Sequence, residues 1–288
     1  MPLSLTPIMP GFAAEAGGLD LSSPLDSPDI RAIEAAMDEH AVLVFRGQAL
    51  APEAQLRFAQ NFGKLDLGFK KASKAPNRLA HEALLDISNV DETGQVADRN
   101  HRKIVGNLAN QLWHSDSSFQ NPPARYSMLH AVVLPAAGGE TEFADMRAAC
   151  DALPPAQRQR LRELRAEHYA LHSRFLLGDD DYSEAQRQAI PPVVWPLVRR
   201  HPGSGRELLF IGAHASRVLE LSVAEGRLLL MDLLEHATQP RFVYRHAWRP
   251  ADLVMWDNRS TLHRGRPFDL AARRELRRTT TLEAASAQ

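Results

Sequence analysis

The chain has 288 residues, and its 34 Lys and Arg against 35 Asp and Glu give a formal net charge of -1. A near-neutral chain attracts neither a polyanion nor an anionic membrane surface, which argues against nucleic acid as a partner. The length suffices for one large core, and no internal repeat or Gly-, Ser- or Pro-rich linker divides the sequence. We therefore predict a single domain over residues 1–288.

The first residues lack a basic segment followed by a continuous apolar run, and no later segment approaches the ~20 apolar residues that span a bilayer. These features predict a soluble, cytoplasmic protein with no membrane partner. Cys150 is the single cysteine, which excludes an intrachain disulfide and a cysteine-built zinc site, and we expect it to be a small buried side chain. Twelve histidines leave imidazole as the available ligand for a transition metal.

The first predicted elements are two helices and two strands. Ser27-Pro28-Asp29 begins a helix, with Ser27 as the N-cap and Pro28 at the first helical position. A buried strand follows over residues 41–45, and a helix over residues 52–62 carries apolar side chains on one face. The next strand covers residues 126–134, which are rich in branched and aromatic side chains.

The middle of the chain predicts further helices around one strand. Residues 155–168 predict a helix, and residues 175–195 predict a long loop with one short helix, a kind of segment that often forms a lid. A short strand is expected over residues 208–211. The capping box at residues 222–225 then begins a helix that reaches about residue 236.

The last two predicted strands cover residues 253–256 and 275–282, and turn residues bound each of them. The whole set consists of many short strands with intervening helices, and it lacks the regular strand–helix alternation of a parallel sheet. This pattern predicts a mixed, mainly β fold of the α+β class. Its core is expected to be a jelly roll, or double-stranded β-helix, with helical insertions.

Candidate metal ligands are His114, Asp116 and His263. If the segment around residue 115 is extended, the side chains of His114 and Asp116 project to the same side. His263 follows the predicted strand 253–256 and a turn, so a neighbouring strand could place it at the same point. Two imidazoles and one carboxylate suit a non-haem Fe(II) site with open coordination positions. Two hydrogen-bonded histidines and a turn-capping Asp116 would give the same short pattern, so the H-x-D motif alone does not establish a metal site.

Residues 273–280 have the period of a strand, which places Arg274 and Arg278 on one face, about 13 Å apart at ~3.3 Å per residue. Arginine binds a carboxylate through two parallel hydrogen bonds, so the pair suits a site for two separate carboxylates. Both follow His263 closely enough for the next strand of a hairpin to bring them beside the same metal. A solvated strand edge would contain the same arginines, whereas a nucleic-acid patch would need interleaved aromatic residues.

Four features follow one another along the chain. They are the H-x-D motif, a threonine in Gly138-Gly139-Glu140-Thr141-Glu142-Phe143, the segment Trp256-Asp257-Asn258-Arg259 ahead of His263, and the Arg274/Arg278 pair. In this order they resemble the taurine/2,4-dichlorophenoxyacetate family of Fe(II)- and 2-oxoglutarate-dependent dioxygenases. The resemblance covers nearly the whole chain.

The resemblance implies a role for each residue of the site. The implied Fe(II) ligands are His114, Asp116 and His263. Thr141 and Arg274 would hold the distal carboxylate of 2-oxoglutarate, and Arg278 would bind the substrate anion. Further residues that the resemblance places at the substrate pocket are Lys71, Asn110, Ser117 and His214.

The implied reaction consumes O2 and 2-oxoglutarate and hydroxylates the carbon between the ether oxygen and the carboxylate of an aryloxyacetate. It would release a phenol and glyoxylate, together with succinate and CO2. Because Arg278 recognises an anion rather than a ring, a sulfonate such as taurine or another small carboxylic acid stays open as the substrate. A metal-binding jelly-roll module without turnover is a further alternative, as is a zinc hydrolase, although the sequence contains no H-E-x-x-H motif.

Two positions depart from the pattern that the resemblance predicts. Arg217 stands where a histidine is expected, and Gln95 stands where a lysine is expected. We therefore expect the aryl-ether end of the pocket to differ, while the iron chemistry is unaffected. A homo-oligomer is expected from the frequency of association among soluble enzymes of this size.

Overall fold

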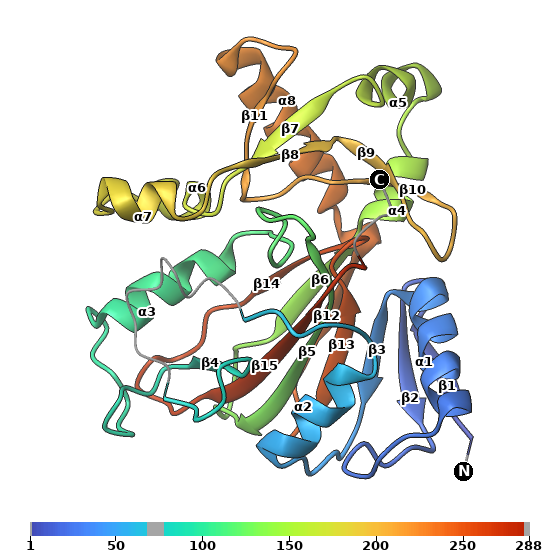
Figure 1. Ribbon diagram of the computed structural model, residues 1–288, viewed down its shortest axis with the longest axis vertical. Coiled ribbons are helices and arrows are strands. Elements are labelled where there is room, and N and C mark those ends of the chain that lie inside the picture. The colour runs from blue at the N-terminus through green and yellow to red at the C-terminus, as the bar shows by residue number, and fades with distance from the viewer. Residues whose placement is uncertain (1, 68–77, 285–288) are drawn as a thin grey trace.

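The computed structural model describes residues 2–67 and 78–284 (Figure 1). In these residues the strands form four sheets, and the largest sheet has seven strands. In spatial order they are β1 (Ser4–Met9), β2 (Ala13–Gly17), β3 (Val42–Phe45), β13 (Leu253–Asp257), β5 (Ala124–Val133), β15 (Glu275–Leu282) and β4 (Leu85–Ser88). β2 and β3 pair in parallel, and the other neighbouring strands are antiparallel.

Three smaller sheets complete the described strands. One three-stranded sheet has the order β12 (Val243–His246), β6 (Thr141–Asp145) and β14 (Thr261–Gly265). The other has the order β11 (Ala215–Val218), β7 (Arg165–His168) and β8 (Val193–Pro196). A two-stranded sheet pairs β10 (Glu207–Leu209) with β9 (Val198–Arg200).

The helices lie mostly at the outside of these sheets (Figure 1). The α-helices are α1 (Ser27–His40), α2 (Pro52–Gln60), α3 (Arg102–Asn107), α4 (Met146–Asp151), α5 (Pro155–Leu161), α6 (His172–Phe175), α7 (Glu184–Gln188) and α8 (Val223–Ala237). The 3-10 helices are η1 (Leu108–Gln111) and η2 (Pro240–Phe242). Within the described ranges, no helix combines the length and the apolar character that crossing a bilayer requires.

One face of the seven-stranded sheet packs against α1 and α2. Phe45 of β3 and Met255 of β13 point to this face, where they belong to one buried cluster with Met37 of α1 and Phe58 of α2. Side chains alternate along a strand, so their neighbours in sequence point to the opposite face. The opposite face of the sheet therefore also carries apolar side chains that require a cover.

The opposite face packs against the β12–β6–β14 sheet. Val44 of β3 and Trp256 of β13 share a second buried cluster with Phe143 of β6 and Tyr244 of β12. The Phe143 and Trp256 ring centroids are 5.4 Å apart, and the Phe143 and Tyr244 rings are stacked. Two sheets thus enclose one core, and the candidate functional residues come from both of them.

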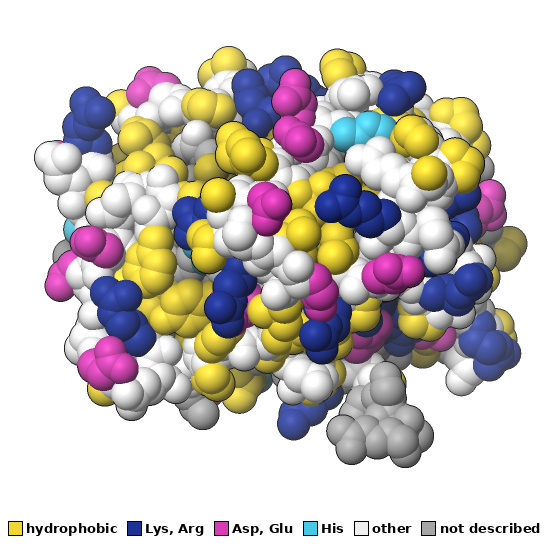
Figure 2. Space-filling model, turned by 90° about the horizontal axis from the view of Figure 1, so that it is seen from above, with side chains coloured by type: hydrophobic (Ala, Val, Ile, Leu, Met, Phe, Trp, Pro, Cys, Tyr) yellow, Lys and Arg dark blue, Asp and Glu magenta, His cyan; other side chains and the backbone are white. Residues whose placement is uncertain are grey.

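A third cluster joins the remaining sheets to α4 and α8 at the top of Figure 1. It contains Ala166 of β7, Leu209 of β10 and Leu233 of α8, together with Cys150, which is fully buried as predicted. Figure 2 looks onto this part of the molecule, where hydrophobic side chains lie between charged ones.

Several predicted elements are confirmed. β15 begins and ends at the predicted residues, Glu275 and Leu282. Ser222 caps α8 in a capping box with Glu225, and α8 ends at Ala237. The predicted short helix in the 175–195 segment is α7. Helices and several sheets occur together, so the α+β class is confirmed.

Two predictions were wrong in detail. The N-cap of α1 is Asp26, whose carboxylate accepts a hydrogen bond from the Asp29 backbone N–H, and Ser27 is the first helical residue. The helix expected over residues 155–168 ends at Leu161, and residues 165–168 form β7. Pairing on both edges, with β8 and β11, stabilises the strand and overrides the local helical pattern.

Candidate active site

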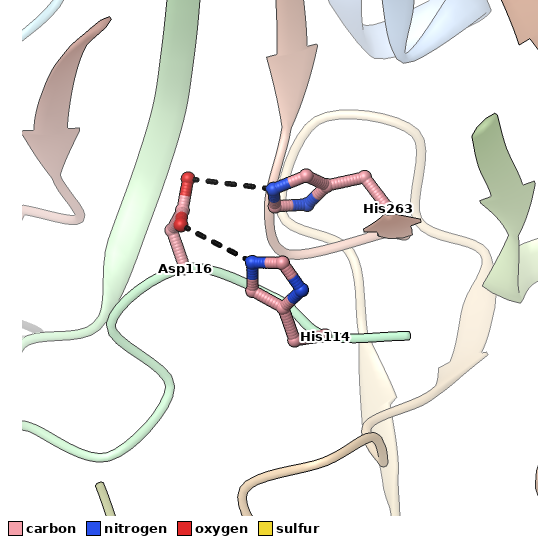
Figure 3. Close-up of side chains that lie close together, drawn as sticks. All are labelled: His114, Asp116 and His263. Carbon is pink, nitrogen blue, oxygen red and sulfur yellow. Dashed lines mark ion pairs between the residues drawn. The ribbon is translucent and has the colours of Figure 1, made fainter. Parts of the chain in front are cut away.

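His114, Asp116 and His263 lie together in the structure (Figure 3). His114 Nε2 is 3.8 Å from Asp116 Oδ1, and His263 Nε2 is 3.8 Å from Asp116 Oδ2. One possible ligand atom from each residue lies within 4.8 Å of the other two, and all three residues are buried. The 3.8 Å separations exceed hydrogen-bond lengths, so the three groups surround a point where one ion can bind all of them.

Backbone pairing between distant segments creates this arrangement. The His114 N–H donates to His263 O at 3.0 Å, and the His263 N–H donates to His114 O at 2.8 Å. This isolated bridge sets the two imidazole centroids 4.2 Å apart. The expected extended segment is limited to this bridge, because the chain turns at Ser117, whose φ is 46°.

The predicted hairpin between His263 and the arginines was wrong. His263 lies in β14, which pairs with β6 in the three-stranded sheet, whereas Arg278 lies in β15 of the seven-stranded sheet. Arg274 immediately precedes β15. His263, Arg274 and Arg278 still lie close together, because the two sheets pack face to face and enclose a pocket between them.

Asp116 is ionised in this environment. Arg278 Nη1 donates to Asp116 Oδ1 at 2.6 Å, and Ser127 Oγ donates to Asp116 Oδ2 at 2.7 Å. Burial opposes ionisation and raises the pKa of the Asp116 carboxyl, but its charged and hydrogen-bonding neighbours, above all the Arg278 charge, lower this pKa more strongly, to about 2. A carboxylate ligand is therefore available at neutral pH.

The two histidines keep their neutral form. Burial lowers the pKa of His114, and it lowers the pKa of His263 well below the usual value. His114 Nδ1 lies 2.8 Å from the Leu112 carbonyl oxygen, which fixes the proton on Nδ1 and leaves the Nε2 lone pair toward Asp116. Two neutral imidazoles and one carboxylate form a set suited to a divalent transition metal.

Arg274 is a buried cation beside this set. Its side chain is 8% exposed, and burial lowers its pKa to about 10, so it remains charged at neutral pH. Its Nη2 donates to the Gly139 carbonyl at 3.0 Å, and the guanidinium lies 5.3 Å from the Phe268 ring centroid. Among the described residues no carboxylate pairs with it, and its Nε has no hydrogen-bond partner. Such a group requires an anionic ligand to compensate its charge.

One pocket connects the predicted residues. Its polar lining includes His114, Asn110, Thr141, His263, Arg274 and Arg278. Its apolar lining includes Ile87, Ile104, Leu108, Leu129, Phe268 and Leu270. The pocket therefore combines the two histidines and two cationic groups with a hydrophobic wall, as a site for anionic organic molecules requires.

The other predicted substrate residues have different surroundings. Asn110 lines it from η1. The His214 ring lies 6.1 Å from the His114 ring and 4.8 Å from the Phe119 ring. Ser117 Oγ donates to Asp66 Oδ2 at 2.6 Å. Lys71 lies outside the described residues.

The two departures from the expected pattern do not line this pocket. Arg217 pairs with Glu167 at 2.9 Å and is half exposed. Gln95 is exposed, and its backbone N–H donates to the Asp91 carboxylate in a turn. The expected change at the aryl-ether end of the pocket has no counterpart in these positions.

The sequence prediction did not include the residues that orient the predicted ones. Ser127 and Asn258 both contact Asp116, and Trp248 Nε1 donates to Thr141 Oγ1 at 3.1 Å. Ser127 is a polar residue between the apolar side chains of β5, next to Met128, which is the one signal in the sequence that could have identified it. Asn258 follows β13 at a position where asparagine would be expected for a turn alone.

Comparisons with known proteins identify the family. The family model described as "Taurine catabolism dioxygenase TauD, TfdA family" matches residues 4–280. The alpha-ketoglutarate-dependent 2,4-dichlorophenoxyacetate dioxygenase of Cupriavidus pinatubonensis is 63% identical over 283 residues, which cover 98% of this chain and 99% of that protein. The protein of the same name from Burkholderia sp. is 61% identical, covering 95% of this chain and 92% of that protein.

A solved structure is also similar. The crystal structure of AAD-2 in complex with Mn(II) and N-oxalylglycine has a TM-score of 0.95 and 43% sequence identity, and the match covers 99% of both chains. The family model, the relatives and the fold agree over almost the full sequence. The chain belongs to the TauD, TfdA family, and it is an alpha-ketoglutarate-dependent dioxygenase.

Proposed function

We propose that this enzyme hydroxylates the carbon between the ether oxygen and the carboxylate of an aryloxyacetate such as 2,4-dichlorophenoxyacetate. Two relatives above 60% identity carry that substrate in their names. The observation that carries the proposal is the buried trio of His114, Asp116 and His263 beside two arginines in one pocket. The hydroxylated product is a hemiacetal, which breaks down to a phenol and glyoxylate.

His114, Asp116 and His263 are the ferrous-ion ligands in this proposal. The donor set fits the ion because it offers two neutral imidazole nitrogens and one carboxylate oxygen, and such a set leaves coordination positions open. Ferrous ion, 2-oxoglutarate and O2 together supply the oxidising chemistry, which releases succinate and CO2. The protein supplies placement and excludes water.

The distal carboxylate of 2-oxoglutarate binds Arg274 and Thr141. Arg274 is buried without a carboxylate partner among the described residues, so an incoming carboxylate compensates its charge. Because the Thr141 oxygen already accepts a hydrogen bond from Trp248, its own hydrogen is free to point at the ligand. N-oxalylglycine, which is bound in the AAD-2 structure, has the 2-oxoglutarate skeleton with an N–H in place of one methylene.

The substrate carboxylate binds Arg278. One guanidinium nitrogen of Arg278 contacts Asp116, and its Nε has no hydrogen-bond partner among the described residues. A carboxylate held there sits next to the metal ligands, so the adjacent methylene rather than the ring faces the ion. Asn110, Ser117, His214 and Lys71 are proposed to surround the rest of the substrate.

The finer description of the fold is also a proposal. The packing of a large, mainly antiparallel sheet against a small antiparallel sheet around one core supports a double-stranded β-helix with helical insertions. Clusters of buried residues that span the sheets support one domain over the whole chain. The homo-oligomeric state and the cytoplasmic location expected from the sequence stay predictions.

The test is succinate release by Fe(II)-loaded protein with 2-oxoglutarate and O2, measured with 2,4-dichlorophenoxyacetate, unsubstituted phenoxyacetate and taurine. We expect both aryloxyacetates to stimulate succinate release and to yield one phenol per succinate. Succinate release with taurine, together with no phenol from either aryloxyacetate, would show that the substrate is a sulfonate and not an aryloxyacetate. Absence of succinate with every acid would remove the proposal.

Two variants assign the anion sites within the same assay. Arg278→Ala raises KM for the aryloxyacetate by the equivalent of roughly 2–5 kcal/mol, because one partner of a buried charged contact is lost. Arg274→Ala raises KM for 2-oxoglutarate instead. Saturation curves in the two cosubstrates separate these effects, and unchanged curves would reassign the anion sites.

A further inference from the structure

A buried hydrogen-bonded chain of side chains ends on Asp116. Ser127 Oγ lies 2.7 Å from Asp116 Oδ2, Asn258 Nδ2 lies 2.9 Å from Ser127 Oγ, and Thr280 Oγ1 lies 2.9 Å from Ser127 Oγ. Ser127, Asn258 and Thr280 are between 0% and 3% exposed. They come from β5, from the end of β13 and from β15, three neighbouring strands of the large sheet.

The direction of these hydrogen bonds follows from the donors present. Asn258 Oδ1 accepts from the Asp116 backbone N–H at 3.1 Å and from Trp256 Nε1 at 3.0 Å, so the amide oxygen must face them. The amide nitrogen therefore faces Ser127 and donates to its oxygen. An ionised Asp116 can only accept, so the Ser127 hydrogen points at Asp116.

The direction of the hydrogen bond between Thr280 and Ser127 follows from these assignments. Because Ser127 donates its single hydrogen to Asp116, the hydroxyl of Thr280 must donate to Ser127 Oγ. Ser127 thus accepts two hydrogen bonds and donates one, and each accepted bond strengthens its donation to the carboxylate. The three side chains act on one oxygen of Asp116, and Arg278 contacts the other oxygen.

We propose that Ser127, supported by Asn258 and Thr280, is a positioning residue that holds Asp116 in its metal-binding orientation and so sets the affinity of the site for the ion. The inference rests on the proposed metal centre and concerns residues outside it. Asn258 fixes the Asp116 backbone directly and fixes its side chain through Ser127, so binding requires little rearrangement of the carboxylate. Partners of this kind orient a ligand without touching the metal, and losing one typically weakens metal affinity about 10- to 100-fold.

A core hydrogen bond could instead serve packing alone, and two adjacent threonines separate these cases. Thr279 and Thr280 are both buried in β15, and valine has nearly the same shape as threonine. Thr279 Oγ1 lies 3.8 Å from the Met128 sulfur, whereas Thr280 contacts Ser127. Thr280→Val removes a donor from the chain, and Thr279→Val is the matched control outside it.

The experiment titrates metal-free protein with Mn(II) alone and follows free Mn(II) by electron paramagnetic resonance. We expect the wild type to bind one Mn(II), Ser127→Ala to bind about 10- to 100-fold more weakly, and Thr280→Val to bind severalfold more weakly. Thr279→Val should stay within about twofold of the wild type. Thermal unfolding of the metal-free variants checks that each is folded, and the isosteric Thr280→Val carries the test if Ser127→Ala does not fold.

Three other outcomes would contradict the proposal. Wild-type affinity in both Ser127→Ala and Thr280→Val overturns the positioning role and leaves the metal centre intact. An equal loss in Thr279→Val and Thr280→Val also overturns it, because the effect then comes from packing. A wild type that binds no Mn(II) overturns the proposed metal centre and this inference with it.

Discussion

At the scale of single residues, Arg274 is the feature that most needs explanation. A buried guanidinium without a carboxylate partner among the described residues costs stability, so its position must be enforced by its surroundings. Asn89 provides this support: its Oδ1 accepts from the Arg274 backbone N–H at 2.8 Å, and its Nδ2 donates to the carbonyls of Leu270 and Ala272. The segment before β15 is thereby fixed, and the charge stays in the pocket.

Gly139 gives a test of this position. It has a φ of +72°, and a Cβ added to it would lie 2.8 Å from Arg274 Nε. Gly139→Ala should therefore displace the guanidinium and weaken binding of 2-oxoglutarate at least tenfold, which corresponds to about 1.4 kcal/mol. Calorimetric titration of the Mn(II)-loaded protein with 2-oxoglutarate under anaerobic conditions measures the change.

The control for this variant is Gly205→Ala. Gly205 has a similar φ of +68°, but an added Cβ meets nothing within 4 Å. Both substitutions introduce the same kind of backbone strain, and only one of them blocks Arg274. A similar loss of 2-oxoglutarate affinity in the two variants would show that strain, rather than displacement of Arg274, is responsible.

The sequence identified the residues of the site better than the residues that support them. The three proposed metal ligands and the arginine pair carry a pattern of residue types that suits the proposed chemistry, and the structure brings them together. Asn89 and Ser127 carry no such pattern, because their roles depend on contacts with residues far away in the sequence. Asn89 contacts Arg274 only because β4 pairs with β15, and single-sequence periodicity does not determine strand order.

At the scale of elements, α3 connects the large sheet to the segment that was expected to form a lid. Lys103 Nζ donates to Asp86 and Ser88 of β4, at 2.7 and 2.9 Å. Its neighbour Arg102 donates through Nη2 to both oxygens of Asp179, at 2.9 and 2.8 Å. Because Ile104 of α3 lines the pocket, these contacts link the pocket wall to residues 176–188, which are the part of the predicted 175–195 segment from the end of α6 to the end of α7.

Arg102→Ala should loosen the 176–188 segment. A partly exposed ion pair of this kind contributes about 0.2–1 kcal/mol, so amide hydrogen exchange there should rise up to about fivefold without a change in the β15 amides. Mass spectrometry of the exchanged protein measures both regions. Arg165→Ala removes the Arg165–Glu220 pair, which joins the start of β7 to Glu220 and includes no residue of the segment, and should leave the segment unchanged. Unchanged exchange in Arg102→Ala would show that other contacts hold the segment.

Prediction of elements from the sequence succeeded where the local pattern was long and unambiguous. β15 has eight residues that include three β-branched threonines, and α8 has a capping box followed by a long apolar run, so both were predicted closely. β7 has four residues and was assigned to a helix, because its strand character comes from pairing with β8 and β11. The expected hairpin after His263 was wrong for a related reason, since β14 pairs in the other sheet.

At the scale of the whole molecule, the fold encloses several histidines in environments that keep them neutral. Burial lowers the pKa of His130 and His246, and it lowers the pKa of His168 from 6.5 to about 3. His168 is fully buried, stacks on Phe210 and contacts Ser118 Oγ at 3.1 Å through Nδ1. Folding therefore excludes protons that the unfolded chain binds below pH 6.5.

The stability of the metal-free protein should consequently fall as the pH falls below 6.5. Between pH 6.5 and about 3 the unfolded chain holds a proton on residue 168 and the folded chain does not, so this residue alone contributes a slope that approaches about 1.4 kcal/mol per pH unit. Urea unfolding at pH 7, 6 and 5 measures the dependence.

The control is His168→Asn, which keeps a nitrogen near Ser118 but cannot take up a proton in this range. The free energy of unfolding of this variant should therefore change less steeply with pH than that of the wild type, whatever the overall stability of the variant. Parallel pH profiles for the wild type and the variant would mean that His168 is protonated in the folded protein, which would contradict the neutral buried state described here.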